Sequence, residues 1–259
     1  MPLLYFGGQM LSQKNIKKIR KNGLILYVEG ADKSGKSTYI NELSEYFTSL
    51  GMRTIVLNKY PSLEKFLKGG SNDQSLFIKD HIHNGLLAIE QFRNFGRNTV
   101  VLIDRSLLTT IINLSMDNFD NYCSEPNAKA DNIHLTLLLS YLSEYQKSRL
   151  NFNTLFRLDT KLKKATKVIS DKIKSLITEP FVVMMVIDRV MLDVDEHITK
   201  QRREQLRKAY RYTYDNFKLG IIRKLYLDDF MFCEVSPDKN IQEQFTYLTK
   251  KLNKVIGRI

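Results

Sequence analysis

The sequence contains few cysteines and no long apolar run. Cys123 and Cys233 are its two cysteines, and they lie far apart in the chain. Two such cysteines do not form a disulfide framework or a metal cluster, and they suit a reducing compartment. No apolar stretch approaches the roughly 20 residues that span a bilayer, and no signal-peptide core is found. We therefore expect a soluble, cytoplasmic protein without membrane partners.

The chain also has no internal repeat and no low-complexity linker that would divide its 259 residues. A hydrophobic fraction of 43% is enough for one large core. Positive charge is in excess, with 40 Lys and Arg against 28 Asp and Glu and a formal net charge of +12. Such a surface attracts nucleic acid or polyanionic nucleotides. Because the lysines are spread over the chain and no nucleic-acid-binding motif occurs, nucleic acid is not the expected main ligand.

The most informative stretch reads LILYVEGADKSGKSTY, from Leu24 to Tyr39. Leu24–Val28 is a short apolar run that predicts a buried strand, and residues 30–37 fill every position of the pattern GxxxxGK[ST]. A helix is expected from Ser37 to about Leu50. Strand, glycine-containing loop and helix in this order form a P-loop, whose backbone N–H groups bind phosphate. The expected ATP-binding residues of this loop are Gly30, Ala31, Asp32, Lys33, Ser34, Gly35, Lys36, Ser37 and Thr38.

Each residue type in the loop suits this chemistry. Gly30 and Gly35 let the backbone turn sharply and approach a ligand closely. Lys36 can reach the β- and γ-phosphates, and the hydroxyl group of Ser37 can coordinate Mg²⁺. The alternative is a glycine turn that matches the pattern by chance, but the flanking strand and helix argue against it. The sequence therefore predicts ATP and Mg²⁺ as ligands.

Apolar runs alternate with helical patterns over most of the chain. Strands are expected at residues 54–57, 99–103, 181–187 and 230–235, and helices at 75–94 (one or two), 199–217 and 241–255. This alternation predicts an α/β P-loop NTPase fold, with a five-stranded parallel sheet and helices on both faces.

Two segments stand outside the alternation. Residues 1–23 carry a basic run and precede the first strand, so we expect a basic N-terminal extension that is poorly ordered or packed on the surface. Residues 116–179 contain no convincing strand, and we interpret them as a helical insertion into a P-loop nucleotide kinase domain formed by residues 24–259.

A second group of candidate residues is Asp104 and Arg105, at the end of an expected buried strand. Ligands of parallel α/β sheets bind at the carboxyl ends of the strands. A carboxylate there can hold Mg²⁺, and a guanidinium beside it can stabilise charge on a phosphate. A purely structural ion pair is the alternative, and the P-loop upstream favours the catalytic interpretation.

Together these motifs resemble the thymidylate kinase family over about residues 24–255, with the insertion left out. The matching motifs are Glu29-Gly30-x-Asp32-x-x-Gly35-Lys36-Ser37-Thr38, Tyr60-Pro61, Asp104-Arg105 and Val235-Ser236-x-x-x-x-Ile241. Enzymes of this family transfer the γ-phosphate of ATP to dTMP, giving dTDP, with Mg²⁺. The resemblance also implies a homodimer, with the helices around residues 76–93 as the expected contact.

The resemblance further implies roles for single residues. Asp32 would contact the 3′-hydroxyl group of the substrate sugar, and Tyr60 would stack on the base. Asn84 and Arg93 are the candidates for the helix position that binds thymine. The remaining assignments are Lys33, Lys36, Asp104 and Arg105 as catalytic residues, Arg105 also as a substrate contact, Ser37 and Asp104 as metal ligands, and Arg202 and Arg203 as ATP-binding lid residues.

Three departures from the family pattern concern the acceptor side. The family has Phe-Pro-x-Arg where this chain has Tyr60-Pro61-Ser62-Leu63. Asn84 stands near the position at which a helix arginine of the family binds thymine. Ser106 follows Arg105 where the family usually has an aromatic residue. Lys59, Arg93 and Arg149 are candidates to replace the missing arginines. The alternatives are therefore a deoxynucleoside kinase, a kinase for another dNMP, or a non-catalytic ATP-binding protein with nucleic-acid or protein partners. The sequence leaves the base specificity open.

Overall fold

The computed structural model of the chain describes residues 11–31, 33–58, 75–110, 112–113, 180–189, 200–218 and 227–259. Within the expected insertion it also describes residues 164, 167–169, 171–172 and 176. Its strands are β1 (Leu24–Glu29), β2 (Arg53–Leu57), β3 (Thr99–Asp104), β4 (Phe181–Arg189) and β5 (Asp229–Val235). Its helices are α1 (Gln13–Asn22), α2 (Lys36–Ser49), α4 (Ser75–Phe95), α8 (Lys200–Lys218) and α9 (Ile241–Arg258).

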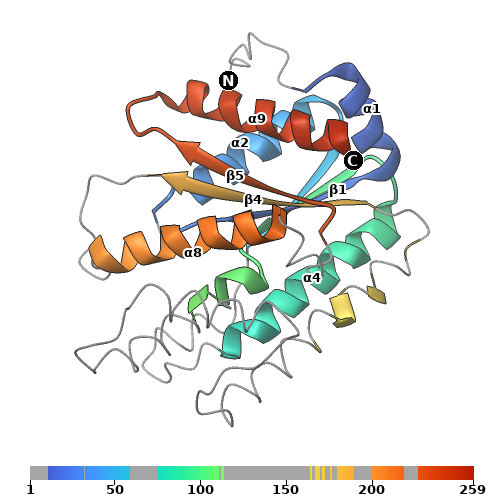
Figure 1. The fold of residues 1–259 in the computed structure, drawn as a ribbon. Coiled ribbons are helices and arrows are strands. Elements are labelled where there is room, and N and C mark those ends of the chain that lie inside the picture. Colours follow the sequence, from blue (N-terminus) through green and yellow to red (C-terminus); the bar gives the residue numbers. More distant parts are fainter. Residues whose placement is uncertain are drawn as a thin grey trace.

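The five strands form one parallel sheet in the order β2-β3-β1-β4-β5 (Figure 1). The central strand β1 lies between β3 and β4, so the carboxyl ends of β3 and β4 flank the loop that follows β1. Helices α1, α2 and α9 cover one face of the sheet, and α4 and α8 cover the other. The predicted α/β fold with a five-stranded parallel sheet is confirmed.

The core consists of two layers, one on each face of the sheet. In β1, Leu24, Leu26 and Val28 pack with α1, α2 and α9, whereas Ile25 and Tyr27 pack with α4 and α8. All six residues of the strand are buried. A strand that is covered on both faces needs apolar residues at nearly every position, which explains the continuous apolar run in the sequence.

The expected strands and helices agree with the structure to within a few residues at their ends. For example, the strand expected at 181–187 extends over Phe181–Arg189, and residues 75–94 belong to a single helix, α4. Within the described part of the chain, no helix is both long enough and apolar enough to cross a membrane. Cys233 is a free, buried thiol in β5, and burial raises its pKa to about 12; Cys123 lies outside the described residues.

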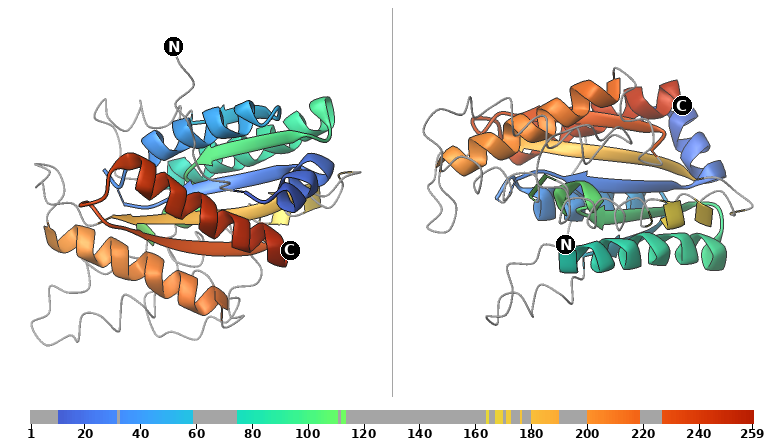
Figure 2. Two further views of the ribbon diagram at one scale, coloured as in Figure 1. Left: turned by 90° about the horizontal axis from the view of Figure 1, so that it is seen from above. Right: turned by 60° about the horizontal axis from the view of Figure 1, so that its bottom comes forward.

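The helix α1 was not expected from the sequence. The Ser12 hydroxyl group accepts a hydrogen bond from the Asn15 backbone N–H and caps the helix, which ends before Gly23. Ile16 and Ile19 are buried in the same core layer as α9. Figure 2 shows α1 beside the end of α9, where the Asn15 side-chain amide donates to the Asn253 backbone carbonyl at 2.7 Å. Residues 11–22 are thus packed into the core, and the preceding ten lie outside the described residues.

Most of the expected insertion at 116–179 also lies outside the described residues. Of the described positions in it, Ile169 is helical and 1% exposed, and it packs against the core layer between the sheet and α4. A Cβ on Gly85 of α4 would lie 3.1 Å from its Cδ1 atom. Glycine at this position therefore makes room for a side chain from the insertion.

Candidate nucleotide-binding site

The loop between β1 and α2 is held close to β4 by its first glycine. Gly30 has φ 141°, and a Cβ on it would lie 2.4 Å from the backbone oxygen of Ile187. Gly35, with φ 89°, precedes the first residue of α2 and provides no side-chain cap. A helix that begins after such a glycine, with no side-chain cap from it, is the arrangement by which a phosphate-binding loop receives an anion.

The side chain of Lys36 is hydrogen-bonded to the start of this loop. This side chain is buried, and Nζ donates to the backbone oxygens of Gly30 at 3.0 Å and Ala31 at 2.7 Å. Ser37 and Thr38 are exposed on the first turn of α2. Lys33 is exposed and has φ 61°, an uncommon backbone conformation for a residue with a side chain. The loop therefore presents backbone N–H groups, a lysine and hydroxyl groups, while Asp32 lies outside the described residues.

Asp104 and Arg105 lie directly beside the start of the loop. Val28 of β1 pairs with Asp104 of β3, and the Arg105 N–H donates to the Val28 carbonyl at 2.9 Å. Arg105 has φ 69°. A left-handed conformation at a residue other than glycine costs free energy and is concentrated at functional sites. The structure thus brings Lys36, Asp104 and Arg105 to one edge of the sheet.

The residues at this edge fit a magnesium ion. The described part of the chain contains no group of three or more His, Cys, Asp or Glu side chains that could hold a metal ion. Mg²⁺ is commonly bound by one or two protein oxygens together with substrate phosphates and water. The hydroxyl group of Ser37 and the carboxylate of Asp104 provide such a donor set, which suits an ion that arrives with a nucleotide.

Glu29, the last residue of β1, belongs to the sequence motif, but the motif predicts no role for it. It is 0% exposed, and its Oε1 accepts hydrogen bonds from the backbone N–H of Ser106 at 2.6 Å and from the Ser106 hydroxyl group. Its Oε2 accepts from the hydroxyl groups of Thr109 and, at 3.2 Å, Tyr210. Burial raises the pKa of Glu29, although these hydrogen bonds and the charge of Arg105 act in the opposite direction.

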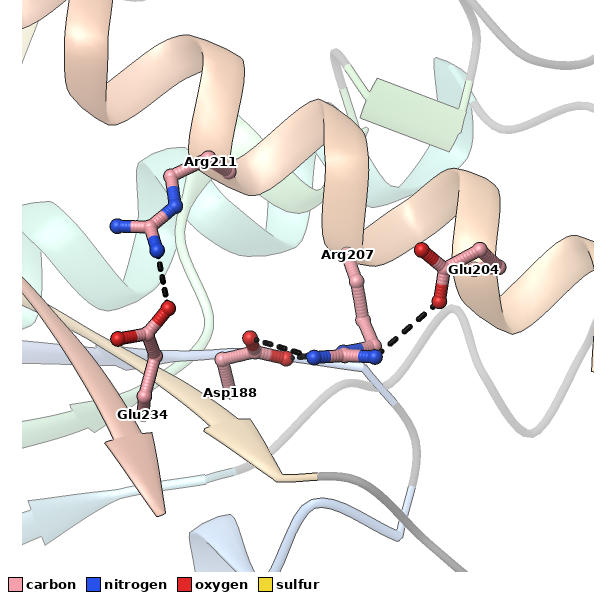
Figure 3. A network of polar contacts seen from close by, with 5 residues as sticks. All are labelled: Asp188, Glu204, Arg207, Arg211 and Glu234. Carbon is pink, nitrogen blue, oxygen red and sulfur yellow. Dashed lines mark hydrogen bonds and ion pairs between the residues drawn. The ribbon is translucent and has the colours of Figure 1, made fainter. Parts of the chain in front are cut away.

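Ion pairs join α8 to the carboxyl ends of two further strands (Figure 3). Arg207 binds Asp188 at the end of β4 with two hydrogen bonds, of 2.5 Å from Nε and 3.0 Å from Nη2, and it also contacts Glu204 at 3.1 Å. These contacts raise the pKa of Arg207. Arg211 pairs with Glu234 of β5. Tyr210, also on α8, donates a hydrogen bond to Glu29 at the end of β1. Polar contacts thus attach α8 to the ends of β1, β4 and β5.

A further arginine at the loop was missed by the sequence analysis. Arg189 ends β4, and its Nη1 lies 3.7 Å from the position of a Cβ on Gly35. A signal for it exists in the sequence, because residues 101–105, at the end of β3, read VLIDR and the last five residues of β4 read MVIDR. Of the expected lid residues, Arg203 is partly buried in the first turn of α8, and Arg202 is helical, with its side chain outside the described part.

The helix α4 contributes a buried polar stretch below the sheet. Asp80, His81 and Asn84 are at most 7% exposed. Burial first, and then the positive charge of Arg105, lower the pKa of His81 to about 3, so its imidazole is neutral at physiological pH. The charge of Arg105 therefore acts on the segment of α4 that contains Asn84, and α4 packs against β3.

Arg93 is not brought to the site. It is exposed in the last turn of α4, directly after Phe92, whose ring covers Gly23 at the start of β1. The P-loop follows the other end of β1, about 20 Å away for a six-residue strand. In this structure Arg93 thus lies near the opposite end of β1 from the P-loop, while Tyr60 lies outside the described residues.

Comparisons with known proteins assign no family to the chain. No family model matches it, and no curated protein does either. Among solved structures, it is similar to thymidylate kinase from Ehrlichia chaffeensis, with 12% identity, a TM-score of 0.46 and coverage of 90% of this chain and 99% of the other. It is also similar to APE1195, with 11% identity, a TM-score of 0.36 and coverage of 92% and 97%. Likeness at this level assigns no activity, and the α/β fold with a P-loop rests on the chain's own sheet order and loop geometry.

Proposed function

We propose that the protein is an ATP-dependent nucleoside monophosphate kinase with dTMP as its substrate. One observation carries the proposal: the end of β3 puts Asp104 and Arg105 directly beside the P-loop, and Arg105 is held there in a left-handed conformation with φ 69°. A P-loop alone would support nucleotide binding. The adjacent carboxylate and guanidinium supply groups for phosphoryl transfer as well.

In this proposal catalysis consists of positioning and electrostatic stabilisation. Lys36 and the N–H groups at the start of α2 bind the β- and γ-phosphates of ATP. Arg105 and Lys33 stabilise the negative charge that develops on the transferred group. Ser37 and Asp104 would hold Mg²⁺, which neutralises phosphate charge when it is bound. Arg202 and Arg203, at the start of α8, would approach the phosphates from the lid side.

The acceptor would lie on the β3 side of the P-loop, between that strand and α4. Asn84 is on this side, and the family resemblance adds Tyr60 and Asp32. An observation also favours the second candidate, a nucleoside or another dNMP as acceptor. Arg93 is at the opposite end of the sheet, so within the described part of the chain Arg105 is the cation shown beside this side of the P-loop. The other candidates for binding an acceptor phosphate, Lys59 and Arg149, fall outside that part.

The deciding experiment is a coupled ADP-release assay with ATP and Mg²⁺. The acceptors are dTMP, dUMP, dCMP, dGMP, AMP and free thymidine. We expect selective turnover of dTMP. Turnover of thymidine or another monophosphate instead would keep the kinase and change its substrate. Measurable ATP binding without turnover of any acceptor would contradict the proposal and favour a non-catalytic ATP-binding protein.

Two variants test the catalytic roles within the same assay. We expect Lys36→Ala and Arg105→Ala each to lower kcat at least about a hundredfold, the scale of losing one transition-state donor. Lys14→Ala, which removes an equal charge from the exposed surface of α1, is the matched control and should leave kcat unchanged. Near-normal turnover in both site variants would contradict the assigned roles.

The homodimer belongs to the same proposal. Its expected contact is α4, where Ile82, Leu86 and Leu87 are only partly buried within the chain. Light scattering should then give a mass of twice 30.2 kDa. A single-chain mass at micromolar concentration would remove the dimer from the proposal without affecting the kinase assignment.

A further inference from the structure

The two strands that flank β1 have the same dipeptide, Asp-Arg, at their carboxyl ends or directly across them. Asp104-Arg105 follows the buried part of β3, and Asp188-Arg189 stands at the end of β4. Because β3 and β4 lie on opposite sides of β1, the two dipeptides flank β1 and the loop that follows it from opposite sides. The proposed function uses only the first pair. The second pair has no role in it.

The partner of Asp188 is not its neighbour in sequence. Its carboxylate, with a side chain 7% exposed, is bound by two hydrogen bonds from Arg207 (Figure 3). The carboxylate of Asp188 is therefore not the partner of Arg189. The Nε atom of Arg189 is buried and has no hydrogen-bond partner among the described residues. A buried N–H group of a cation normally has an acceptor, so the position of Arg189 indicates that an acceptor comes from a ligand.

The location of Arg189 indicates which ligand. Its Nη1 lies 3.7 Å from the Cβ position of Gly35, the residue that precedes the phosphate-binding end of α2. Its charge also acts on Tyr39, in the first turn of α2. An anion bound to the N–H groups of that turn would therefore lie beside a guanidinium. Arginine suits phosphate because its planar group donates two parallel hydrogen bonds.

Hydrogen bonds join the structural elements on this side of the loop. The Tyr39 hydroxyl group donates to Gln244 of α9, and the Gln244 side-chain amide donates to the backbone oxygens of Ser236 at 2.9 Å and Lys239 at 2.6 Å. The turn after β5 is thus fixed to the helix that begins at the P-loop. A phosphate chain that leaves the loop toward β4 and β5 would meet preformed structure there.

We propose that Arg189 binds the phosphate chain of the donor nucleotide on the β4 side of the P-loop, opposite Arg105. The ligand class is a nucleoside di- or triphosphate, and the contact is made to its phosphate oxygens and not to its base. This inference rests on the proposed use of a nucleotide donor but is independent of the acceptor. Arg105 then acts on the β3 side, where transfer occurs, and Arg189 acts on binding of the donor.

The test is a calorimetric titration of the full chain with ADP, with inorganic tripolyphosphate and with adenosine. For Arg189→Ala we expect affinity for ADP and for tripolyphosphate to fall about 10- to 100-fold, the range for losing a charged hydrogen bond. Arg189→Lys keeps the positive charge but not the planar group with two parallel donors, so its loss of affinity should be smaller. Binding of adenosine should not change. Arg211→Ala is the matched control, because Arg211 pairs with Glu234 and stacks over Phe232.

Unchanged affinity of Arg189→Ala for ADP and tripolyphosphate would overturn the inference, and so would absence of ADP binding by the unaltered protein. If Arg189→Ala does not fold, unchanged affinity in Arg189→Lys and Arg189→Gln has the same meaning. The outcome for the proposed kinase function is separate from the outcome for this inference. Loss of ADP affinity in Arg189→Ala without phosphoryl transfer to any acceptor would leave the inference intact, whereas full kinase activity with unchanged ADP affinity would overturn the inference alone.

Discussion

At the scale of single residues, Glu29 combines two opposing effects. Its full burial disfavours the charged carboxylate, whereas donors from Ser106, Thr109 and Tyr210 favour it. Burial is the larger effect, so the pKa of Glu29 is raised from its ordinary value of 4.5. Three segments meet on this carboxylate: the end of β1, the turn after β3, and α8. Its protonation therefore affects the stability of the site's framework.

The first prediction concerns the pH dependence of stability in Glu29→Gln. Because the folded-state pKa is raised, the native protein binds more protons than the unfolded chain above pH 4.5, and its stability falls as pH rises through that range. Glutamine has the same shape and no charge to desolvate. We therefore expect the free energy of unfolding of Glu29→Gln, relative to the wild type, to increase from about pH 4.5 upward.

Urea unfolding at several pH values measures this difference. A difference that stays constant with pH, or that decreases, would contradict the prediction. Glu29→Ala is the companion variant, because it also removes the acceptors of the Ser106 N–H and the Thr109 hydroxyl group. It should destabilise the protein at every pH, by about 1–3 kcal/mol for buried donors left unpaired.

The same residues show how much of the site the sequence can predict. Lys36, Asp104 and Arg105 could be proposed from the sequence because a local motif or the end of a strand points to each of them. The role of Glu29 depends on partners 77, 80 and 181 positions away. Those separations carry no local pattern, so only the fold brings the partners together. Arg93 illustrates the opposite case, because nearness in sequence to Asn84, in the middle of α4, does not keep it from lying in the last turn of the helix, away from the P-loop.

At the scale of elements, α8 is the helix whose position depends most clearly on charged contacts. Residues 207 and 211 lie one turn apart on one face, and each meets a carboxylate at the end of a different strand. The two pairs differ in exposure. In the first, the Asp188 side chain is 7% exposed, whereas in the second the side chains of Arg211 and Glu234 are 45% and 59% exposed.

This difference gives the second prediction. Arg207→Ala leaves the buried carboxylate of Asp188 without its two hydrogen bonds, which should cost about 1–3 kcal/mol of unfolding free energy. Arg211→Ala removes an exposed pair and should cost at most about 1 kcal/mol. Urea unfolding of the two variants at neutral pH compares them directly. Equal losses, or a larger loss for Arg211→Ala, would show that burial of Asp188 does not determine the strength of the attachment.

The elements also differ in how far the sequence predicts them. The strands were recognised because burial on both faces makes their sequences continuously apolar, as in the run FVVMMVI of β4. The helix α1 was missed because Ile16 and Ile19, its buried apolar residues, alternate with basic residues such as Lys14, Lys17 and Lys18. A narrow apolar stripe in a basic segment has the composition of a surface arm, and only its contact with α9 distinguishes it.

At the scale of the whole molecule, the sheet order β2-β3-β1-β4-β5 divides the site into two sides. The β3 side contains Asp104, Arg105 and α4, and the β4 side contains Arg189 and the turn after β5. The sequence predicted a parallel sheet but not this order, because the pairing of Leu24 with Phe181 joins segments with the insertion between them. In the proposed kinase, this division would let the acceptor and the donor bind on separate sides of one loop.

The net charge of +12 also belongs to this scale and gives the last prediction. Dispersed positive charge gives weak, non-specific binding of DNA, with dissociation constants of roughly 10⁻⁴–10⁻⁶ M at physiological salt. A fluorescently labelled duplex, titrated by anisotropy at several salt concentrations, should show this weak affinity and lose it steeply as salt increases. Binding of ADP should persist, because backbone N–H groups and Lys36 contribute to it besides the surface charge. Submicromolar binding of DNA at physiological salt, together with no turnover of any acceptor, would contradict the kinase proposal, because the basic surface would then serve a nucleic acid.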